Sequence, residues 1–206
     1  MDMNKKSINE EIKMKKDKIF GKLAILIIAI STLLITVGIA SADPLAGEEG
    51  QTQSMIIIGC ALAMGIAGIG SAMGLMLAGT SAVAVTGEKP ELFGRCLVFQ
   101  VLPMTQAVYG LLTAILLMMG AGLLGGSGTD LTNPMLGISA IGIGLVVGLT
   151  GISAANQGMV ASASISATAR NPNVAARGII YTVMPETIAI FGLLVGILLM
   201  TGLGLL

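Results

Sequence analysis

Residues 174–206 read VAARGIIYTVMPETIAIFGLLVGILLMTGLGLL and contain only two charged side chains, Arg177 and Glu186. As a helix rising about 1.5 Å per residue, such a run is longer than the roughly 30 Å hydrocarbon core of a bilayer. Three apolar runs of similar length precede it, at 55–86, 92–124 and 135–168. The sequence therefore predicts an all-α membrane protein with four membrane-spanning helices.

The composition of the whole chain favours the same class. Of 206 residues, 54% are hydrophobic and 11% are charged, whereas soluble domains carry about 25% charged residues. The chain has no histidine, which excludes histidine metal ligands, a Ser-His-Asp triad and a histidine proton relay. The formal net charge is zero, and basic residues are not interleaved with aromatic ones, so nucleic acid is not expected as a partner.

A basic leader and an apolar segment precede the four runs. Residues 1–18 are polar and rich in lysine, and the apolar segment 19–42 ends in Ala40-Ser41-Ala42. This order is typical of a cleavable secretory signal, but the apolar part is longer than the usual core of about 7–15 residues. We therefore expect either a cleaved signal or an additional transmembrane helix. In both cases the leader stays cytoplasmic and the chain after residue 42 begins on the opposite side.

Short polar breaks divide the four runs into two tandem helical hairpins, 55–124 and 135–206. Beyond the leader and Lys22, the basic residues lie only at or beside the two turns within these hairpins, as Lys89, Arg95, Arg170 and Arg177. Basic loops stay on the cytoplasmic side of a membrane. The sequence thus predicts a multi-pass protein of the cell membrane with both hairpin turns cytoplasmic and the C-terminus outside.

The two hairpins repeat each other at an offset of 82 residues without gaps. The matched pairs include Pro90 with Pro172, Arg95 with Arg177, Pro103 with Pro185, and Thr105 with Thr187. Each unit has two spans, so both copies have the same orientation, unlike the inverted repeats of many secondary transporters.

The first helix of each hairpin is rich in small residues, with spacings such as Gly70 to Gly74 and Gly144 to Gly148. Such spacings let helix backbones approach closely in a membrane. Close packing within one chain explains them, and so does a crowded inner ring built from many copies. The second helices are bulkier, which suits an outer ring.

One acidic residue lies deep in an apolar run. Ten of the eleven acids fall in the tail, the loops or first helical turns, but Glu186 lies about 18 Å along the last helix, near the bilayer midplane. An ionised carboxylate there costs at least about 3 kcal/mol, and no lysine or arginine lies at that depth. Its partner is expected to be a proton or a metal ion, and the alternative is a permanently protonated carboxyl group with a structural role.

Further polar residues are predicted at the depth of Glu186. On the second helix, Leu102, Thr105, Gln106 and Tyr109 follow the i, i+3, i+4, i+7 spacing of a single face. Gln157 lies in the middle of the third helix. Each glutamine, taken alone, is more simply explained as a partner in an interhelical hydrogen bond.

Taken together, these residues could hold a cation. A sodium ion would have five oxygens available, from Glu186, Gln106, Gln157, Thr105 and a main-chain carbonyl near Pro103. A proton needs only the carboxylate. Pro103 and Pro185 each remove a helix hydrogen bond and loosen the helix beside the acid. Met104 occupies the first-repeat position of Glu186, so we expect one ionisable site per four helices.

Residues 55–206 resemble the membrane-rotor proteolipid, the c or K subunit, of V-type and archaeal A-type ATPases. The resemblance rests on the duplicated hairpin and on three motifs, Gly79-Thr80-Ser81, Leu102-Pro103-Met104-Thr105-Gln106 and Met184-Pro185-Glu186-Thr187. It implies that Glu186 carries the ion, and that Tyr109 donates a hydrogen bond to it. In sodium-transporting members the remaining ligands fall on the main chain of Leu102 and on Thr105, Gln106 and Gln157. Because every position is filled, the resemblance implies Na⁺ rather than H⁺.

The resemblance also implies the assembly. Each chain would be a non-catalytic protomer of a rotor ring of identical copies in the lipid bilayer, coupled to ATP hydrolysis or synthesis. The ring would turn past a stator subunit with an essential arginine, and a central stalk would contact the cytoplasmic turns at 87–91 and 169–173. Two other classes stay open: a stand-alone transporter or channel, and a structural proteolipid that seals a ring or pore. The Glu186 cluster argues against the structural class.

Overall fold

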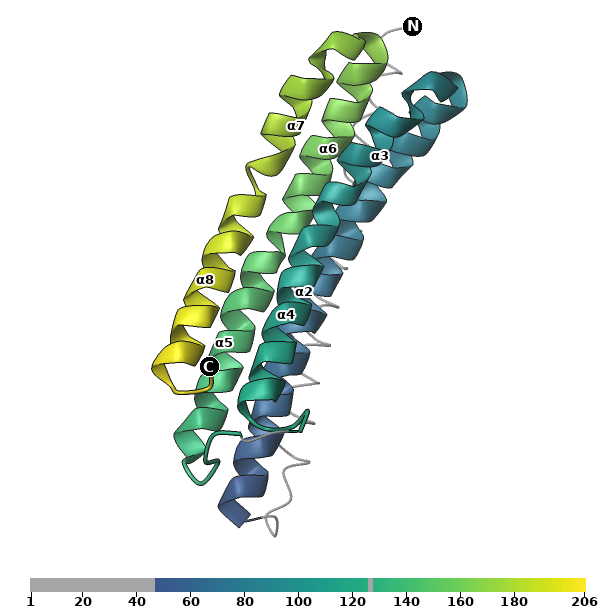
Figure 1. Ribbon diagram of the computed structural model, residues 1–206. Helices are drawn as coiled ribbons and strands as arrows, with labels where there is room; N and C mark the ends of the chain where they lie inside the picture. Colours follow the sequence, from purple (N-terminus) through teal and green to yellow (C-terminus); the bar gives the residue numbers. More distant parts are fainter. Residues whose placement is uncertain (1–46, 126–127) are drawn as a thin grey trace, which may run out of the picture. The chain divides into compact units, whose positions relative to one another are not determined.

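A computed structural model describes residues 47–125 and 128–206 of the chain (Figure 1). The described residues contain four helices long and apolar enough to cross a membrane, at Gly47–Glu88, Pro90–Gly120, Pro134–Arg170 and Pro172–Gly202. The predicted class, an all-α membrane protein with two tandem hairpins, is confirmed. The predicted leader 1–18 and the apolar segment 19–42 lie outside the described residues.

The spans are built from several shorter elements. The first hairpin comprises α2 (Gly47–Glu88), η1 (Pro90–Leu92), α3 (Phe93–Val101), η2 (Leu102–Met104) and α4 (Thr105–Gly120). The second hairpin comprises α5 (Pro134–Gly151), α6 (Ser153–Arg170), η3 (Pro172–Val174), α7 (Ala175–Val183) and α8 (Glu186–Gly202). The long helices run side by side, and both hairpin turns lie at the same end of the molecule (Figure 1).

Helix α2 begins before the apolar run predicted from residue 55. Its first turn contains Glu48 and Glu49, whose negative charges stabilise the positive end of the helix dipole. The Thr52 hydroxyl donates to the Glu48 carbonyl oxygen at 3.0 Å. The polar residues before residue 55 therefore belong to helix α2 although they are not apolar, and the first span is longer than hydropathy alone indicates.

The outer ends of α4 and α8 share one kind of cap. Gly122 and Gly204 adopt positive φ angles of 72° and 71°, the left-handed conformation that glycine permits without strain. The Leu123 amide donates to the Met118 carbonyl oxygen at 2.9 Å, and that of Leu205 donates to Met200 at 3.0 Å. These bonds satisfy carbonyl groups at the helix ends. Because the two glycines are 82 residues apart, the repeat extends to the helix caps, and both helices end before the predicted runs do.

Three of the four spans are interrupted part-way. Pro103 lies in the 3₁₀ turn η2, and Pro185 lies between α7 and α8, where Figure 1 shows a visible break. The third span also breaks, at Ile152, and no feature singled out in the sequence predicted this break. The Thr150 hydroxyl donates back to the carbonyl oxygens of Val146 and Val147 at 2.8 and 3.1 Å, a contact that bends helices.

The glycine-rich helices pack backbone against backbone. A methyl group added to Gly144 would collide with the main chain of Gly59, and one added to Gly158 would collide with that of Gly74. A methyl group on Gly70 would likewise meet the main chain at Gly151. Helix α2 therefore approaches α5 and α6 as closely as the prediction from small-residue spacing required.

The two hairpin turns are tied together by basic side chains. The Lys89 ammonium donates to the Ala169 carbonyl oxygen at 2.6 Å, and the Arg95 guanidinium donates to the Pro172 carbonyl oxygen at 3.1 Å. A positive charge at the C-terminal end of α6 also complements its dipole. These contacts link the two hairpins at their turns.

Candidate functional site

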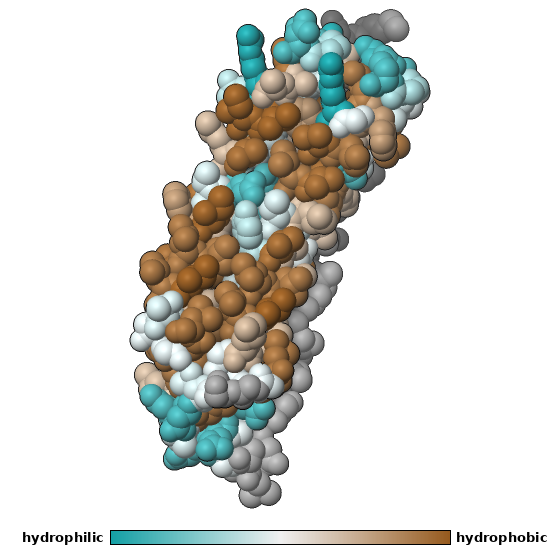
Figure 2. All heavy atoms as spheres, viewed as in Figure 1, coloured by the Kyte–Doolittle hydropathy of each residue, from teal (hydrophilic) through white to brown (hydrophobic). Residues whose placement is uncertain are grey.

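Glu186 begins α8, directly after the break at Pro185. Its side chain is only 8% exposed. Figure 2 shows a hydrophobic surface over most of the molecule's length, hydrophilic ends, and a small hydrophilic patch near the junction of α7 and α8. The carboxylate thus lies within the apolar part of the protein, where its charge needs a partner.

Two side chains donate hydrogen bonds to this carboxylate. The Tyr109 hydroxyl on α4 donates to Glu186 Oε1 at 2.8 Å. The Gln157 Nε2 group on α6 donates to Glu186 Oε2 at 3.2 Å. Each carboxylate oxygen therefore accepts one bond from a different helix, and the acid connects the two hairpins.

The hydrogen-bond network continues away from the carboxylate. Gln106 Nε2 donates to Gln157 Oε1 at 2.6 Å, and the Thr105 hydroxyl lies 3.1 Å from Gln106 Oε1 and 3.0 Å from the Leu102 carbonyl oxygen. Both glutamines are completely buried. The network places the oxygens of Leu102, Thr105, Gln106 and Gln157 one after another beside Glu186.

The proline in the second span gives this network its backbone. Pro103 has no amide hydrogen to donate to the carbonyl of Phe99, and the chain forms the 3₁₀ turn η2 instead of continuing as α-helix. Thr105 and Gln106 then begin α4, and Gln106 contacts Gln157 on α6. The sequence motif of 102–106 therefore fixes both the irregular backbone and the polar side chains.

Ser71 on α2 is a further contributor that was not singled out from the sequence. It is 2% exposed, and its hydroxyl accepts a hydrogen bond from the Ala107 amide at 2.9 Å. This bond fixes the first turn of α4 immediately after Gln106. No feature of the sequence distinguishes Ser71 from the other small residues of its helix, because only the fold brings it to Ala107.

The electrostatics of the site are simple. Within the described residues, no three His, Cys, Asp or Glu side chains gather at one place, and Glu186 has no Lys or Arg within ion-pair distance. One carboxylate surrounded by neutral amides and hydroxyls can balance a single positive charge. The site is therefore suited to a monovalent cation or a proton rather than to a divalent metal, which usually takes more carboxylate ligands.

All six residues singled out from the sequence, Leu102, Thr105, Gln106, Tyr109, Gln157 and Glu186, lie in this one network. Four come from η2 and α4, one from α6 and one from α8. The network thus joins the two hairpins at the depth of Glu186.

Comparison with known families matches the same two hairpins. The family model for the C subunit of ATP synthase matches residues 58–117 and again residues 141–199, together more than half of the chain. The chain belongs to this ATP synthase family. The family match begins and ends within the four spans, and its second copy contains Glu186 and Gln157.

Two relatives within the family are similar to this proteolipid over part of their length. The A-type ATP synthase subunit K of Methanocaldococcus jannaschii is 43% identical over a region that covers 43% of this chain and 41% of that protein. The V-type sodium ATPase subunit K of Enterococcus hirae is 41% identical over 32% of this chain and 42% of that protein. The matched regions thus span about two fifths of each relative's length.

Proposed function

We propose that this chain is the ion-carrying rotor subunit of a V/A-type ATPase, with Glu186 as the carrier. Family membership and the names of the two relatives support the rotor role. The observation that carries the proposal is the buried Glu186 carboxylate, 8% exposed, with oxygen-bearing side chains from two other helices around it. A structural proteolipid has no need of such a costly group.

The ion that fits this site best is Na⁺. A hard cation takes several oxygen ligands, and the network supplies Glu186, the two glutamines, Thr105 and the Leu102 carbonyl, each within hydrogen-bond distance of the next. The terminal torsion of a glutamine is broad, so its amide can present either the oxygen or the NH₂ group. Tyr109 would then hold the carboxylate in place as a donor. A proton would use the carboxylate alone.

Exchange of the ion would couple to rotation. Glu186 bound to Na⁺ is neutral as a unit and can face lipid, whereas the free carboxylate cannot. Release would occur where a stator arginine meets Glu186 in an aqueous half-channel. The remaining proposed partners are identical copies in a membrane ring and a central stalk at the hairpin turns. The basic residues at these turns favour a cytoplasmic location for them, with the C-terminus outside.

A labelling experiment tests both the carrier and the ion. We expect a carbodiimide to modify Glu186 in native membranes, and Na⁺ at constant pH to suppress the modification, because a coordinated carboxylate is not free to react. Mass spectrometry of the chain measures the extent of labelling across sodium concentration and pH. Labelling that responds to pH alone would make H⁺ the ion, and no labelling at all would contradict the carrier role.

The glutamines provide a second test of the ion. Replacing Gln157 by leucine removes one proposed ligand, and we expect the sodium concentration for half-protection of Glu186 to rise by about 10–100-fold. The replacement Gln53→Leu is the matched control, since it makes the same change at an exposed glutamine near the start of α2. An unchanged sodium requirement in Gln157→Leu would remove this residue from the ligand set.

A further inference from the structure

The two hairpins of one chain pack through an apolar cluster near their turns. The first hairpin contributes Ala78, Ala82, Val85, Leu92, Cys96 and Phe99. The second hairpin contributes Ala161, Ile165, Ala175 and Ile179. A methyl group added to Gly178 would lie 3.0 Å from the tip of the Phe99 ring, so Phe99 packs directly over this glycine.

The residues equivalent to the first-hairpin members of this cluster, 82 positions later, lie on an open surface of the second hairpin. The equivalents of the six first-hairpin residues are Val160, Ser164, Ala167, Val174, Gly178 and Tyr181. All six line one cavity of about 390 Å³ between α6 and α7. The second hairpin thus has the surface with which the first hairpin binds its neighbour, but within the described residues no hairpin covers it.

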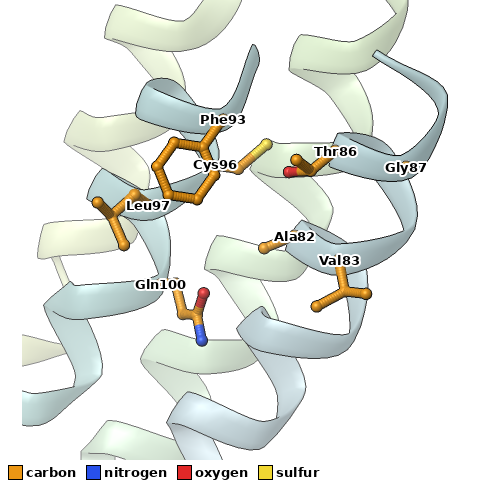
Figure 3. A pocket seen from close by; sticks show the side chains of 8 residues that line it. All are labelled: Ala82, Val83, Thr86, Gly87, Phe93, Cys96, Leu97 and Gln100. Carbon is orange, nitrogen blue, oxygen red and sulfur yellow. The ribbon is translucent and has the colours of Figure 1, made fainter. Parts of the chain in front are cut away.

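The residues equivalent to the second-hairpin members of the cluster, 82 positions earlier, lie on an open surface of the first hairpin. The equivalents of the four second-hairpin residues are Gly79, Val83, Phe93 and Leu97. Val83, Phe93 and Leu97 are 74%, 57% and 43% exposed. With Gln100 they line a cavity of about 350 Å³ between α2 and α3 (Figure 3). The chain therefore carries both halves of a second interface on opposite hairpins.

We propose that a second copy of this chain completes this interface, with Tyr181 of one copy inserted into the α2–α3 cavity of the next. Phe99 and Tyr181 are repeat equivalents, and Phe99 is 1% exposed whereas Tyr181 is 64% exposed. Tyr181 of one copy would lie over Cys96 of the next copy, as Phe99 lies over Gly178 within one chain, because Cys96 and Gly178 are also repeat equivalents. The inference names the copy-to-copy contact within the ring of the proposed function and rests on that function for the membrane setting.

The hydroxyl group of Tyr181 has a suitable partner in that cavity. Gln100 lines it, and within residues 47–125 and 128–206 its amide makes no hydrogen bond. Both ends of the contact therefore have a polar group in an apolar setting, where an unsatisfied group is costly. The hydroxyl of Tyr181 bonded to the Gln100 amide of the next copy satisfies both groups at once. Within one chain the equivalent contact lacks this pair of groups, since Phe99 has no hydroxyl and the equivalent of Gln100 is Thr182.

The same operation explains why each chain has one ion site. Within the chain, Tyr109 bonds to Glu186 and Gln106 bonds to Gln157. Between copies the equivalent pairs are Phe191 with Met104, and Ile188 with Leu75. Polar pairs are thus replaced by apolar ones on both sides. Phe191, Ile188 and Met104 are 62%, 52% and 47% exposed in the single chain, which is expected of residues that a second copy covers.

Disulfide cross-linking tests the docking directly. The Ser81 and Ser162 hydroxyl oxygens lie 2.6 Å apart within the chain, and the equivalent pair between copies is Ala163 with Thr80. In full-length chain with Cys60 and Cys96 replaced by alanine, we expect Thr80→Cys with Ala163→Cys to give a ladder of dimers and higher oligomers on oxidation in membranes. A head-to-tail contact of this kind continues from copy to copy.

Three controls make the result specific. Each single cysteine should remain monomeric, the two singles produced together should stop at dimers, and Ser81→Cys with Ser162→Cys should cross-link only within the chain. The docking is overturned if the last pair oxidises and the Thr80–Ala163 pair does not, since lipid or another part of the chain then covers this face. The cross-links do not depend on ion binding, so they can form even where sodium fails to protect Glu186.

The Tyr181–Gln100 bond needs a separate measurement. We expect Tyr181→Phe and Gln100→Leu each to lower the temperature at which the oligomer dissociates in detergent, and the double variant to be no less stable than either single one. Such non-additivity is the signature of a direct contact. Fully additive shifts would show that the two side chains do not meet, even if the cross-links form.

Discussion

Replacing Glu186 by glutamine is expected to reduce ion transport by the assembled ATPase complex to background. The amide is similar in size to the carboxyl group, and Tyr109 can still donate to its oxygen, so the network that now joins Tyr109, Gln157 and the acid can persist. The amide carries no charge, however, and cannot balance a cation or accept a proton at neutral pH. ATP-driven uptake of radioactive sodium into vesicles containing the complex measures the effect.

Glu49→Gln is the matched control for this variant. It makes the same chemical change at an exposed acid in the first turn of α2, far along the chain from the network. We expect uptake to be unchanged, because Glu49 only complements a helix dipole, a contribution of about 0.3–1 kcal/mol. Transport that survives in Glu186→Gln would contradict the carrier role of this residue.

Hydropathy and the repeat were sufficient to predict the four spans and their pairing. The apolar runs identify the helices because a bilayer requires continuous backbone hydrogen bonding across its core. The helix ends were less accurate. Glu48 and Glu49 extend α2 beyond its apolar run, and Gly122 and Gly204 end α4 and α8 earlier, because caps and dipoles rather than hydropathy determine where a helix stops.

The membership of the polar cluster could also be predicted, but its bonding could not. Depth along a helix places Gln106 near Glu186, yet only the fold shows that Gln106 contacts Gln157 and that Gln157 contacts the acid. Ser71 was missed for the same reason, since its hydroxyl acts on the Ala107 amide of another helix. The break at Ile152 was missed because no proline marks it in the sequence; the side chain beside it, Thr150, bonds back to its own helix.

The repeat is informative because the two hairpins have diverged. Where both copies keep a residue, as at Pro103 and Pro185, the backbone requirement is the same in each. Where they differ, as at Met104 and Glu186, one contact lies within the chain and the other faces outward. Divergence between repeats, as at these two positions, thus distinguishes a contact inside the chain from a position that is exposed in the single chain.

Replacing Gly144 by alanine is expected to destabilise the chain far more than the same change two residues away. The added methyl group would meet main-chain atoms of Gly59, which no change of rotamer can move. Overpacking of this kind costs about 1–3 kcal/mol or more. At Gly142 the methyl group meets nothing within 4 Å, and alanine in a helix interior is favoured over glycine by up to about 1 kcal/mol.

The gain in helix propensity applies at both glycines and cancels, so the two variants should differ by about 1–3 kcal/mol in the free energy of unfolding, measured by denaturant titration in mild detergent. Gly142 is a fair control within an assembly too, since its repeat equivalent is Cys60, a larger residue than alanine, which is buried against Ala114. Equal stability of the two variants would mean that α2 and α5 can separate without cost. The close approach of these helices would then not be what holds the two hairpins, and the network between α4, α6 and α8, in register.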